Sequence, residues 1–252
     1  MLPAHRQGAY RVRFDWGPVG AAAVVADCDV AVVVDVLSFT TTLTVALDAG
    51  TVVHPFRWDP DSAATYAAEL GAAVAVGRSR GGAGKVSLSP LSVRGAAGGG
   101  RLVLPSPNGS ALCFGLAETG VTVLGASLRN ASAVARWVRR REGARVAVIA
   151  AGERWPDGSL RPAAEDLWGA GAVLHALGPL DPAEASPESR SAAEAFVAAS
   201  GDLTGRLREC ASGRELIDKG FAEDVAIAAE FDATAVVPVL RGDAFEDGSE
   251  ST

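Results

Sequence analysis

The segment that most constrains the fold is residues 32–50, VVVDVLSFTTTLTVALDAG. An apolar run rich in β-branched residues, typical of a buried strand, ends at the acidic residue Asp35. A loop with Ser38, Thr40 and Thr41 follows, and then a helix-like stretch that stops at a glycine. The first N–H groups of a helix are unpaired and its dipole is positive there, so this loop should attract an anion. A carboxylate beside an anion site indicates a divalent metal and chemistry on a phosphate-like group.

Residues 102–123 repeat this pattern and align with residues 32–53 without a gap, so that Thr40 falls on Ser110. Each copy is an apolar strand, a polar turn, a helix closed by glycine and a second strand. The match predicts two related units whose loops converge on one site. Because any two strand–helix units look similar at this level, an accidental likeness remains an alternative.

A third segment, residues 145–177, places a polar loop after a predicted strand and opens a helix with Glu165 and Asp166. Adjacent carboxylates in a first helical turn have a structural use, because they complement the helix dipole. If they converge with Asp35, the three carboxylates form a hard-oxygen site suited to Mg²⁺. Arg154, in the same loop, would then face the phosphate or carboxylate of a substrate.

Short apolar runs alternate with helix-like stretches along all 252 residues, of which 48% are hydrophobic. Alternation of this kind predicts an α/β fold: a three-layer α/β/α arrangement with a mostly parallel sheet, in which two similar strand–loop–helix halves could intertwine. The first strand is expected at residues 22–26 and the last at residues 234–239. We expect a single domain over residues 1–240 and an acidic tail over residues 241–252 that frays.

The net charge of −7 argues against binding of nucleic acid through its backbone. No apolar run is long enough to cross a membrane, and the first residues do not have the pattern of a signal peptide. Three widely spaced cysteines are expected to be buried free thiols, which indicates a reducing, cytoplasmic location. The expected partner is a small anionic phosphorylated substrate, with a homodimer left open.

Five segments occur in an order that resembles the 2-phosphosulfolactate phosphatase family: VVVDVLSFTTTLTVALDAG, LPSPNGSALC, SLRNASAVARWV, AAGERWPDGSLRPAAEDLWGAGAVL and ASGRELIDKGFAEDVAIAAEFDATAVVPVL. The resemblance covers about residues 7–245. It implies a compact α/β/α fold and Mg²⁺-dependent hydrolysis of 2-phospho-3-sulfolactate to sulfolactate and phosphate, a step toward coenzyme M.

The resemblance also assigns residues. Asp35 matches the family's acidic residue at the first strand end, and it would be either a metal ligand or the nucleophile. The predicted site comprises Asp35 and Arg154 as catalytic residues; Ser38, Thr40, Thr41, Arg78, Asn108, Gly109 and Ser110 around the phosphate or substrate; and Asp35, Glu165 and Asp166 around Mg²⁺.

The chain departs from the family in residues 77–100. The family shows Gly-Glu-Arg near Gly77, Arg78 and Ser79, and it shows Asn-Ser-Pro where this chain has Leu-Ser-Pro from Leu88 onward. The segment carries several basic residues instead, so we predict weak turnover of 2-phosphosulfolactate and turnover of another phosphorylated hydroxy-acid. Two alternatives stay open: the segment is a solvated connector, or the chain is a non-catalytic small-anion-binding or regulatory protein.

Overall fold

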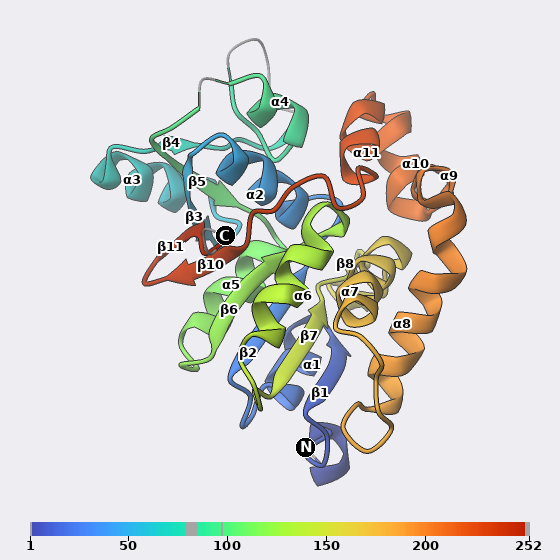
Figure 1. Ribbon diagram of the computed structural model, residues 1–252. Coiled ribbons are helices and arrows are strands. Elements are labelled where there is room, and N and C mark those ends of the chain that lie inside the picture. Colours follow the sequence, from blue (N-terminus) through green and yellow to red (C-terminus); the bar gives the residue numbers. More distant parts are fainter. Residues whose placement is uncertain (1, 79–84, 97, 250–252) are drawn as a thin grey trace.

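The computed structural model describes residues 2–78, 85–96 and 98–249, and it contains a nine-stranded sheet flanked by helices (Figure 1). The strand order is β1-β7-β2-β6-β10-β11-β3-β5-β4. The strands are β1 (Val12–Trp16), β2 (Val30–Val34), β3 (Val52–Phe56), β4 (Ala73–Val74), β5 (Arg101–Pro105), β6 (Thr122–Ala126), β7 (Val146–Ala150), β10 (Pro238–Arg241) and β11 (Ala244–Asp247). A separate pair consists of β8 (Glu153–Arg154) and β9 (Leu160–Arg161).

Helices cover both faces of the sheet, which confirms the predicted three-layer fold. Val32 and Val34 of β2 pack into one core cluster with residues of α6, α7 and α8, whereas Val33 packs into a second cluster with residues of α1, α2 and α5. The α-helices are α1 (Gly17–Val24), α2 (Phe39–Asp48), α3 (Pro60–Leu70), α4 (Pro90–Arg94), α5 (Gly109–Ala117), α6 (Ala131–Arg139), α7 (Ala164–Ala176), α8 (Pro187–Ala199), α9 (Leu203–Glu209), α10 (Ala211–Asp218) and α11 (Ala222–Ala228). Short 3₁₀ helices are η1 (Pro3–Arg6), η3 (Leu128–Asn130) and η4 (Ser200–Asp202).

The sheet contains two groups of parallel strands, β1-β7-β2-β6 and β3-β5-β4, joined by the antiparallel hairpin β10-β11. The unit β2-α2-β3 starts in the first group and ends in the second, and the unit β5-α5-β6 runs back. The gapless sequence match places Val52, the first residue of β3, on Thr122, the first residue of β6. The topology therefore agrees with two similar intertwined halves.

The first strand was predicted in the wrong place. Residues 22–24 belong to α1, because Pro18 occupies the first turn and an alanine run, which favours helix over strand, follows it. The first strand is instead β1, in which the buried Arg13 interrupts the apolar pattern. Its guanidinium donates hydrogen bonds to three backbone carbonyls within 2.9 Å, those of Tyr10, Val24 and Ala26, and these bonds satisfy the buried charge.

The prediction that the tail frays from residue 241 onward is also wrong for residues 241–247. Residues 244–247 form β11, and the Phe245 side chain is fully buried among otherwise polar neighbours. Phe245 pairs with Val53 of β3, and its ring centroid lies 6.3 Å from that of Phe39. Burial of one aromatic side chain contributes about 1.5–3 kcal/mol, which explains why this short polar stretch stays ordered.

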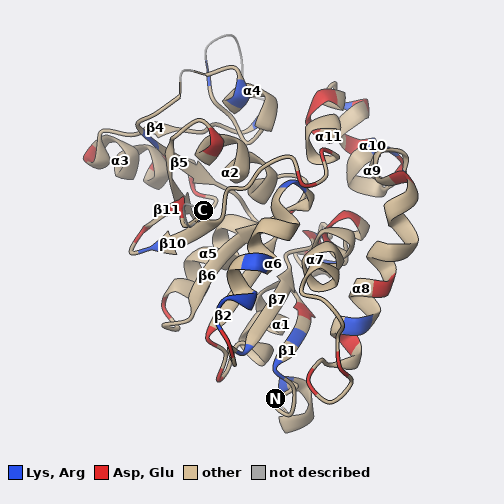
Figure 2. Cartoon of the chain, viewed as in Figure 1, with Lys and Arg blue, Asp and Glu red and all other residues tan. Residues whose placement is uncertain are grey.

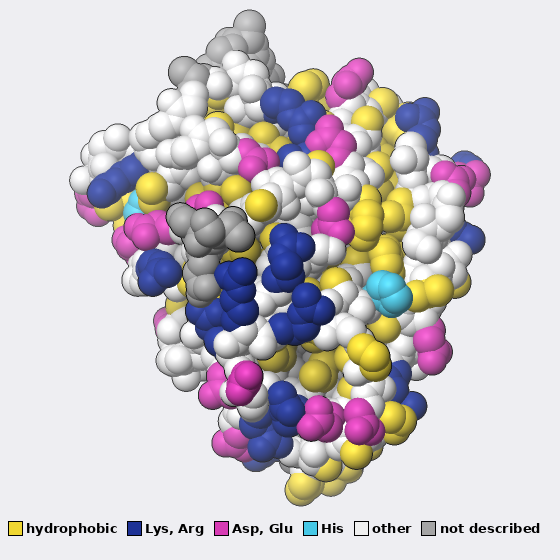
Figure 3. All heavy atoms as spheres, viewed as in Figure 1, with side chains coloured by type: hydrophobic (Ala, Val, Ile, Leu, Met, Phe, Trp, Pro, Cys, Tyr) yellow, Lys and Arg dark blue, Asp and Glu magenta, His cyan; other side chains and the backbone are white. Residues whose placement is uncertain are grey.

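The structure also shows the state of the cysteines and the distribution of charge over the surface. All three cysteines are free; Cys113 is buried, but Cys28 and Cys210 are only partly so. No helix within the described ranges has the length and apolar character needed to cross a membrane. Charged residues are spread over the outer helices and loops (Figure 2), and basic side chains gather on the visible face over α6 (Figure 3).

Candidate active site

One cavity of about 660 Å³ lies where the loops after β2 and β5 meet. Its wall also includes β8, the chain around Arg78 and Leu88, and residues of α10 and the turn that follows it. The lining residues are Asp35, Leu37, Ser38, Trp58, Gly77, Arg78, Leu88, Ser106, Pro107, Asn108, Glu153, Ser212, Glu215, Leu216, Lys219 and Phe221.

Asp35 lies at the centre of this arrangement and is only 5% exposed. One carboxylate oxygen accepts a hydrogen bond from the Phe39 N–H at 3.2 Å, and the other accepts one from the Gly109 N–H at 2.8 Å. Phe39 and Gly109 are the first residues of α2 and α5, so the carboxylate bridges two helix amino termini. This contact confirms that the two predicted loops face one cleft.

Gly109 is required by this close approach. A Cβ atom at this position would lie 2.6 Å from an Asp35 carboxylate oxygen and 2.8 Å from the Phe39 ring. Real Cβ atoms essentially never approach other heavy atoms this closely, so a side chain would displace Asp35 or open the contact between the two helices.

The hydroxyls of Thr40, Thr41 and Ser110 do not face the cavity, contrary to the prediction that they hold phosphate. All three side chains are fully buried. Thr40 donates to the Asp35 carbonyl at 2.7 Å, and Thr41 donates to the Val36 carbonyl at 2.8 Å. Ser110 lies within hydrogen-bond distance of the Phe56 and Leu104 carbonyls, at 2.8 and 3.0 Å. These hydroxyls satisfy backbone groups where strand turns into helix, a common role for Ser and Thr.

Glu153 is a cavity residue that the sequence analysis did not single out. Its carboxylate accepts a hydrogen bond of 2.7 Å from the Asn108 side-chain amide. Burial, and after it the negative charge of Asp35, raise the pKa of Glu153 to about 7 against the opposing effect of the Asn108 hydrogen bond. The available signal was strand alternation: neighbouring residues of a strand point to opposite sides, so Arg154 and Glu153 could not both face the substrate.

Arg154 was predicted to face the substrate, and the structure places it elsewhere. It is exposed, lies outside the cavity lining, and donates to the Pro107 carbonyl at 3.3 Å. Arg154 pairs with Leu160 in the small β8-β9 ribbon, which puts its side chain on the opposite side from Glu153.

The predicted three-carboxylate metal centre is not formed. Across the residues that the structure describes, no group of three or more His, Cys, Asp or Glu side chains is arranged to hold a metal ion. Both carboxylate oxygens of Asp166 accept backbone hydrogen bonds, from the Val36 N–H at 2.7 Å and the Gly152 N–H at 2.8 Å. Asp166 thus ties the loop after β2 to the loop after β7.

The buried carboxylates nevertheless share one negative region. Glu165 is 2% exposed, and its charge contributes to the raised pKa values of Asp35, Glu153 and Asp166. Burial raises the pKa of Asp35 to about 6, although two backbone hydrogen bonds and the positive charge of Arg78 act in the opposite direction. A proton or a cation in this region would relieve the repulsion.

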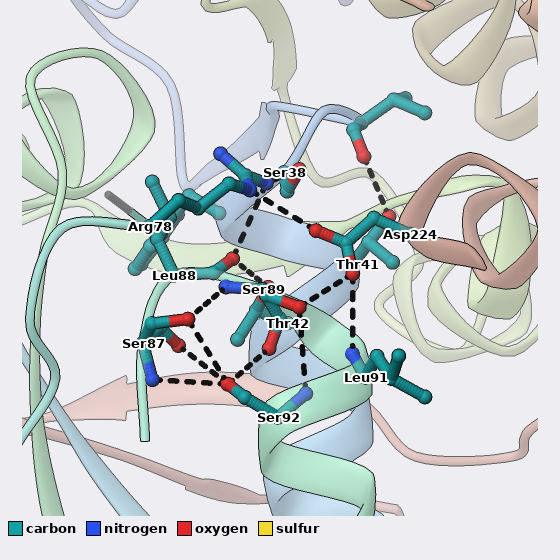
Figure 4. A network of polar contacts seen from close by, with 12 residues as sticks. Ser38, Thr41, Thr42, Arg78, Ser87, Leu88, Ser89, Leu91, Ser92 and Asp224 are labelled. Atoms are coloured by element: carbon teal, nitrogen blue, oxygen red, sulfur yellow. Dashed lines mark hydrogen bonds and ion pairs between the residues drawn. The ribbon is translucent and has the colours of Figure 1, made fainter. Parts of the chain in front are cut away.

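Arg78 borders the cavity, as predicted, and joins a polar network drawn in Figure 4. Its Nη2 donates to the Ser38 hydroxyl and to the Leu88 carbonyl, the latter at 3.4 Å. Its Nε donates to Asp224, a buried residue of α11, at 3.0 Å. Ser38 precedes the first residue of α2, so Arg78 lies beside the helix terminus that binds Asp35.

The rest of the 77–100 segment contributes unequally. Gly77 and Leu88 line the cavity, which favours a role in the site over that of a plain connector. Arg94 forms two hydrogen bonds of 2.8 and 2.7 Å with Glu230, and Lys85 is exposed outside the lining. Arg80 lies outside the described residues. Among the described basic residues of this segment, Arg78 alone borders the cavity.

Residues of α10 and the turn after it complete the wall, and the sequence analysis gave them no role. Ser212, Glu215 and Lys219 face the cavity, and Lys219 pairs with Glu215 at 2.5 Å. Phe221 adds an aromatic ring 5.8 Å from the Arg78 guanidinium carbon. The segment ASGRELIDKGF, which contributes to the family resemblance, was the available signal.

Comparison with known proteins agrees with the resemblance. The family model of 2-phosphosulpholactate phosphatase matches residues 22–243. A probable 2-phosphosulfolactate phosphatase of Thermus thermophilus is 33% identical over 218 residues, covering 85% of this chain and 89% of the relative. A protein of the same name from Deinococcus radiodurans is 30% identical over 217 residues, covering 84% and 88%. The chain belongs to the 2-phosphosulfolactate phosphatase family.

Proposed function

We propose that this protein hydrolyses the phosphate monoester of a small hydroxy-acid that is 2-phosphosulfolactate or closely similar to it. The observation that carries this proposal is the Asp35 carboxylate, held across the amino termini of α2 and α5 at the wall of a polar cavity. Helix amino termini favour phosphate oxygens, and Asp35 would lie directly against the bound phosphorus group. The names of the relatives support the same reaction class.

The phosphoryl group would bind beside Asp35, with hydrogen bonds from Arg78, Ser38 and Asn108, all of which line the cavity. Lys219 and Ser212, on the α10 side, would hold the substrate's acidic groups. These two residues take the substrate-binding role that was predicted for Arg154, because Arg154 lies outside the cavity lining. The cavity would thus bind the phosphate and the acidic groups through different elements.

Glu153 is the best candidate to supply a proton. With a pKa raised to about 7, by burial and by the neighbouring Asp35 charge, it is partly protonated at neutral pH. When it does not hold a metal, a protonated Glu153 could give its proton to the oxygen that leaves phosphorus, as Asp35 or a water molecule attacks phosphorus and the P–O bond to the hydroxy-acid breaks. Asp35 would act either as the attacking nucleophile or as a metal ligand, and both roles require its ionised form.

Mg²⁺ is part of the proposal, and the residues present fit it in part. Mg²⁺ commonly binds one or two carboxylates and completes its shell with water and substrate phosphate. Asp35 and Glu153 both border the cavity and bind the adjacent residues Gly109 and Asn108. They offer hard oxygen donors at the cavity wall, whereas Asp166 lies outside the lining. Both oxygens of Asp35, like those of Asp166, already accept backbone N–H groups, so a metal would bind Asp35 through a remaining lone pair. When bound, Mg²⁺ would neutralise phosphate charge.

The charges of the lining give a reason for such a cation. The lining contains Asp35, Glu153 and Glu215 as acids but Arg78 and Lys219 as bases. A phosphorylated acid that carries several negative charges would therefore enter a site without a surplus of positive charge. A bound cation or protonation of the carboxylates would offset this repulsion.

The test is a phosphate-release assay on 2-phosphosulfolactate, phospholactate and phosphoglycolate, with Mg²⁺ or with EDTA. We expect Mg²⁺-dependent release from at least one of these acids and none in the Asp35→Asn variant. Release from 2-phosphosulfolactate at a rate typical of enzymes on their own substrates would show that the changes in residues 77–100 are neutral. Calorimetric binding of these compounds without release from any would favour the non-catalytic anion binder.

A further inference from the structure

Arg78 is held by contacts on several sides, and one of them comes from outside the cavity. Asp224, in the first turn of α11, is 1% exposed and does not line the cavity. One of its carboxylate oxygens accepts from Arg78 Nε at 3.0 Å (Figure 4). The other accepts from the Ser89 hydroxyl and, at 3.4 Å, from the Leu91 N–H. Burying a charged carboxylate to this degree is costly unless an opposite charge pairs with it, and Arg78 provides that charge for Asp224.

The remaining contacts of Arg78 fix the plane of the guanidinium group. Nη2 donates to Ser38 and to the Leu88 carbonyl, and the Phe221 ring lies 5.8 Å from the guanidinium carbon. Within the described ranges, Nη1 donates to no residue, and it is not among the buried atoms that lack a partner. A planar group whose other nitrogens are bound can present Nη1 to a ligand in one orientation.

The position of Arg78 indicates which part of a ligand it meets. Its positive charge lowers the pKa of Asp35, so the two side chains interact electrostatically, and its partner Ser38 precedes α2. Lys219 and Ser212 lie on a different element of the wall, α10 and the turn after it. The geometry therefore favours contact of Arg78 with the phosphoryl group rather than with the far end of the substrate.

We propose that Asp224 is a positioning residue that holds Arg78 beside Asp35, so that Nη1 of Arg78 binds a phosphoryl oxygen. This inference rests on the proposed phosphatase function, and it assigns α11 a part in that site. Without the carboxylate, the long Arg78 side chain would lose its ion pair and its fixed orientation, although Ser38 and Leu88 would still attract it.

The alternative is a purely structural role, in which Asp224 only connects α11 to α4. Its partners Ser89 and Leu91 lie at the start of α4 and make this role possible. Both roles predict some loss of stability on substitution, so stability alone does not separate them. Binding of phosphate by the folded variant does separate them, because a purely structural contact would not select one part of the ligand.

The experiment measures dissociation constants of full-length Asp224→Asn for inorganic phosphate and for sulfolactate by calorimetry, with the melting temperature recorded for each variant. We expect phosphate to bind about 10-fold more weakly or worse, and sulfolactate to change by less than about 2-fold. Glu184→Gln, which removes an exposed ion pair with Arg11, is the matched control and should change neither constant.

The double variant Arg78→Ala/Asp224→Asn should bind phosphate as weakly as Arg78→Ala alone, because Asp224 acts through Arg78. If Asp224→Asn does not fold, Ser89→Ala, which removes one hydrogen bond to the same carboxylate, should weaken phosphate binding in the same direction.

Unchanged phosphate affinity in the folded variant, a loss confined to sulfolactate, or additive losses in the double variant would overturn the proposal. Wild-type protein that binds phosphate but hydrolyses none of the tested acids would contradict the phosphatase function and leave the role of Asp224 supported. Wild-type protein that binds no phosphate would contradict both.

Discussion

The two strand–loop–helix units share a framework. The first residues of their helices, Phe39 in α2 and Gly109 in α5, both donate a backbone N–H to the same carboxylate. The hydroxyls that follow, those of Thr40 and Ser110, both contact a carbonyl at the end of their own β-strand unit. These matched positions have matched structural roles, although the side chains of Phe39 and Gly109 differ completely in size.

The units differ at the residue that matters most. The gapless match places Asp35 on Pro105, so only the unit β2-α2 supplies a carboxylate at the meeting point. A further carboxylate at position 105 would add to the repulsion that Glu165 already exerts on Asp35. The comparison teaches that the repeated hydroxyls form the scaffold, and that the carboxylate proposed to react lies where the repeat is broken.

The largest expected effect comes from Asp35→Asn, which keeps the size of the side chain and removes its charge. If Asp35 is the nucleophile or a metal ligand, kcat/KM should fall by about 10³-fold or more. Phosphate release reports activity, and circular dichroism should show an unchanged fold. The control is Glu118→Gln, an exposed acid in the other unit, which should retain wild-type activity. Full activity of Asp35→Asn would place the reacting carboxylate elsewhere.

Gly109→Ala should have the next largest effect, because its Cβ would lie 2.6 Å from an Asp35 oxygen. We expect about a 10²-fold loss of kcat/KM through displacement of Asp35. Gly115→Ala, in the same helix, is the control, since an added Cβ would meet no atom within 4 Å beyond its chain neighbours and the backbone of its own helix. That substitution should stabilise the protein by about 0.5–1 kcal/mol in urea unfolding. Equal activities of the two variants would contradict the proposed bridging of the helices by Asp35.

Removal of the matched hydroxyls should affect stability more than catalysis. Thr40→Val and Ser110→Ala each leave buried backbone groups without a partner, so each should lower the free energy of unfolding by about 1–3 kcal/mol. Thr65→Val, which removes an exposed hydroxyl of α3, should cost less than about 0.5 kcal/mol. A large loss of kcat at unchanged stability would restore the original prediction that these hydroxyls hold phosphate.

The smallest expected effect is on the pH dependence of stability. Burial raises the pKa of Asp35 to about 6 and that of Glu153 to about 7. Both folded values exceed the unfolded ones of about 3.9 and 4.3, so the folded state binds protons more tightly. The stability from these groups is therefore complete below about pH 4 and is lost as the pH rises through 6 and 7.

Melting temperatures between pH 5 and 8, without divalent cations, test this expectation. Wild-type stability should fall across this range, and Glu153→Gln should reduce the fall because it removes one of the two groups. Glu69→Gln, an exposed acid on α3, should follow the wild-type curve. Parallel curves for Glu153→Gln and wild type would show that Glu153 does not titrate with a raised pKa.

The sequence was most informative where local pattern and burial agree. The β-branched run before Asp35 predicts a buried strand, and the repeat predicts that two loops meet. Both predictions could be made because each pattern consists of residues adjacent in the chain. The charged residues Arg13 and Asp15 in the five-residue strand β1 interrupt its apolar pattern and hid it from the prediction. Likewise, the lone Phe245 among acidic residues did not reveal the strand β11, whose partner is far away in sequence.

The site was predictable only in part, for a related reason. Residue type indicates which chemistry is available, but not whether a side chain is already occupied. Asp166 and Thr41 have suitable groups, yet nearby backbone groups bind them. Glu153 and Lys219 reach the cavity through the small β8-β9 ribbon and the turn after α10, whose placement depends on long-range packing.

The crossing of the two units also bears on how the molecule comes apart. Neither group of parallel strands is a continuous piece of chain: β2 and β6 pair side by side but belong to different units, and the same holds for β3 and β5. Heat or denaturant cannot loosen one unit without removing strands from both groups. We therefore expect the sheet to melt in a single cooperative transition, and the Asp35 site to be lost together with it rather than before it.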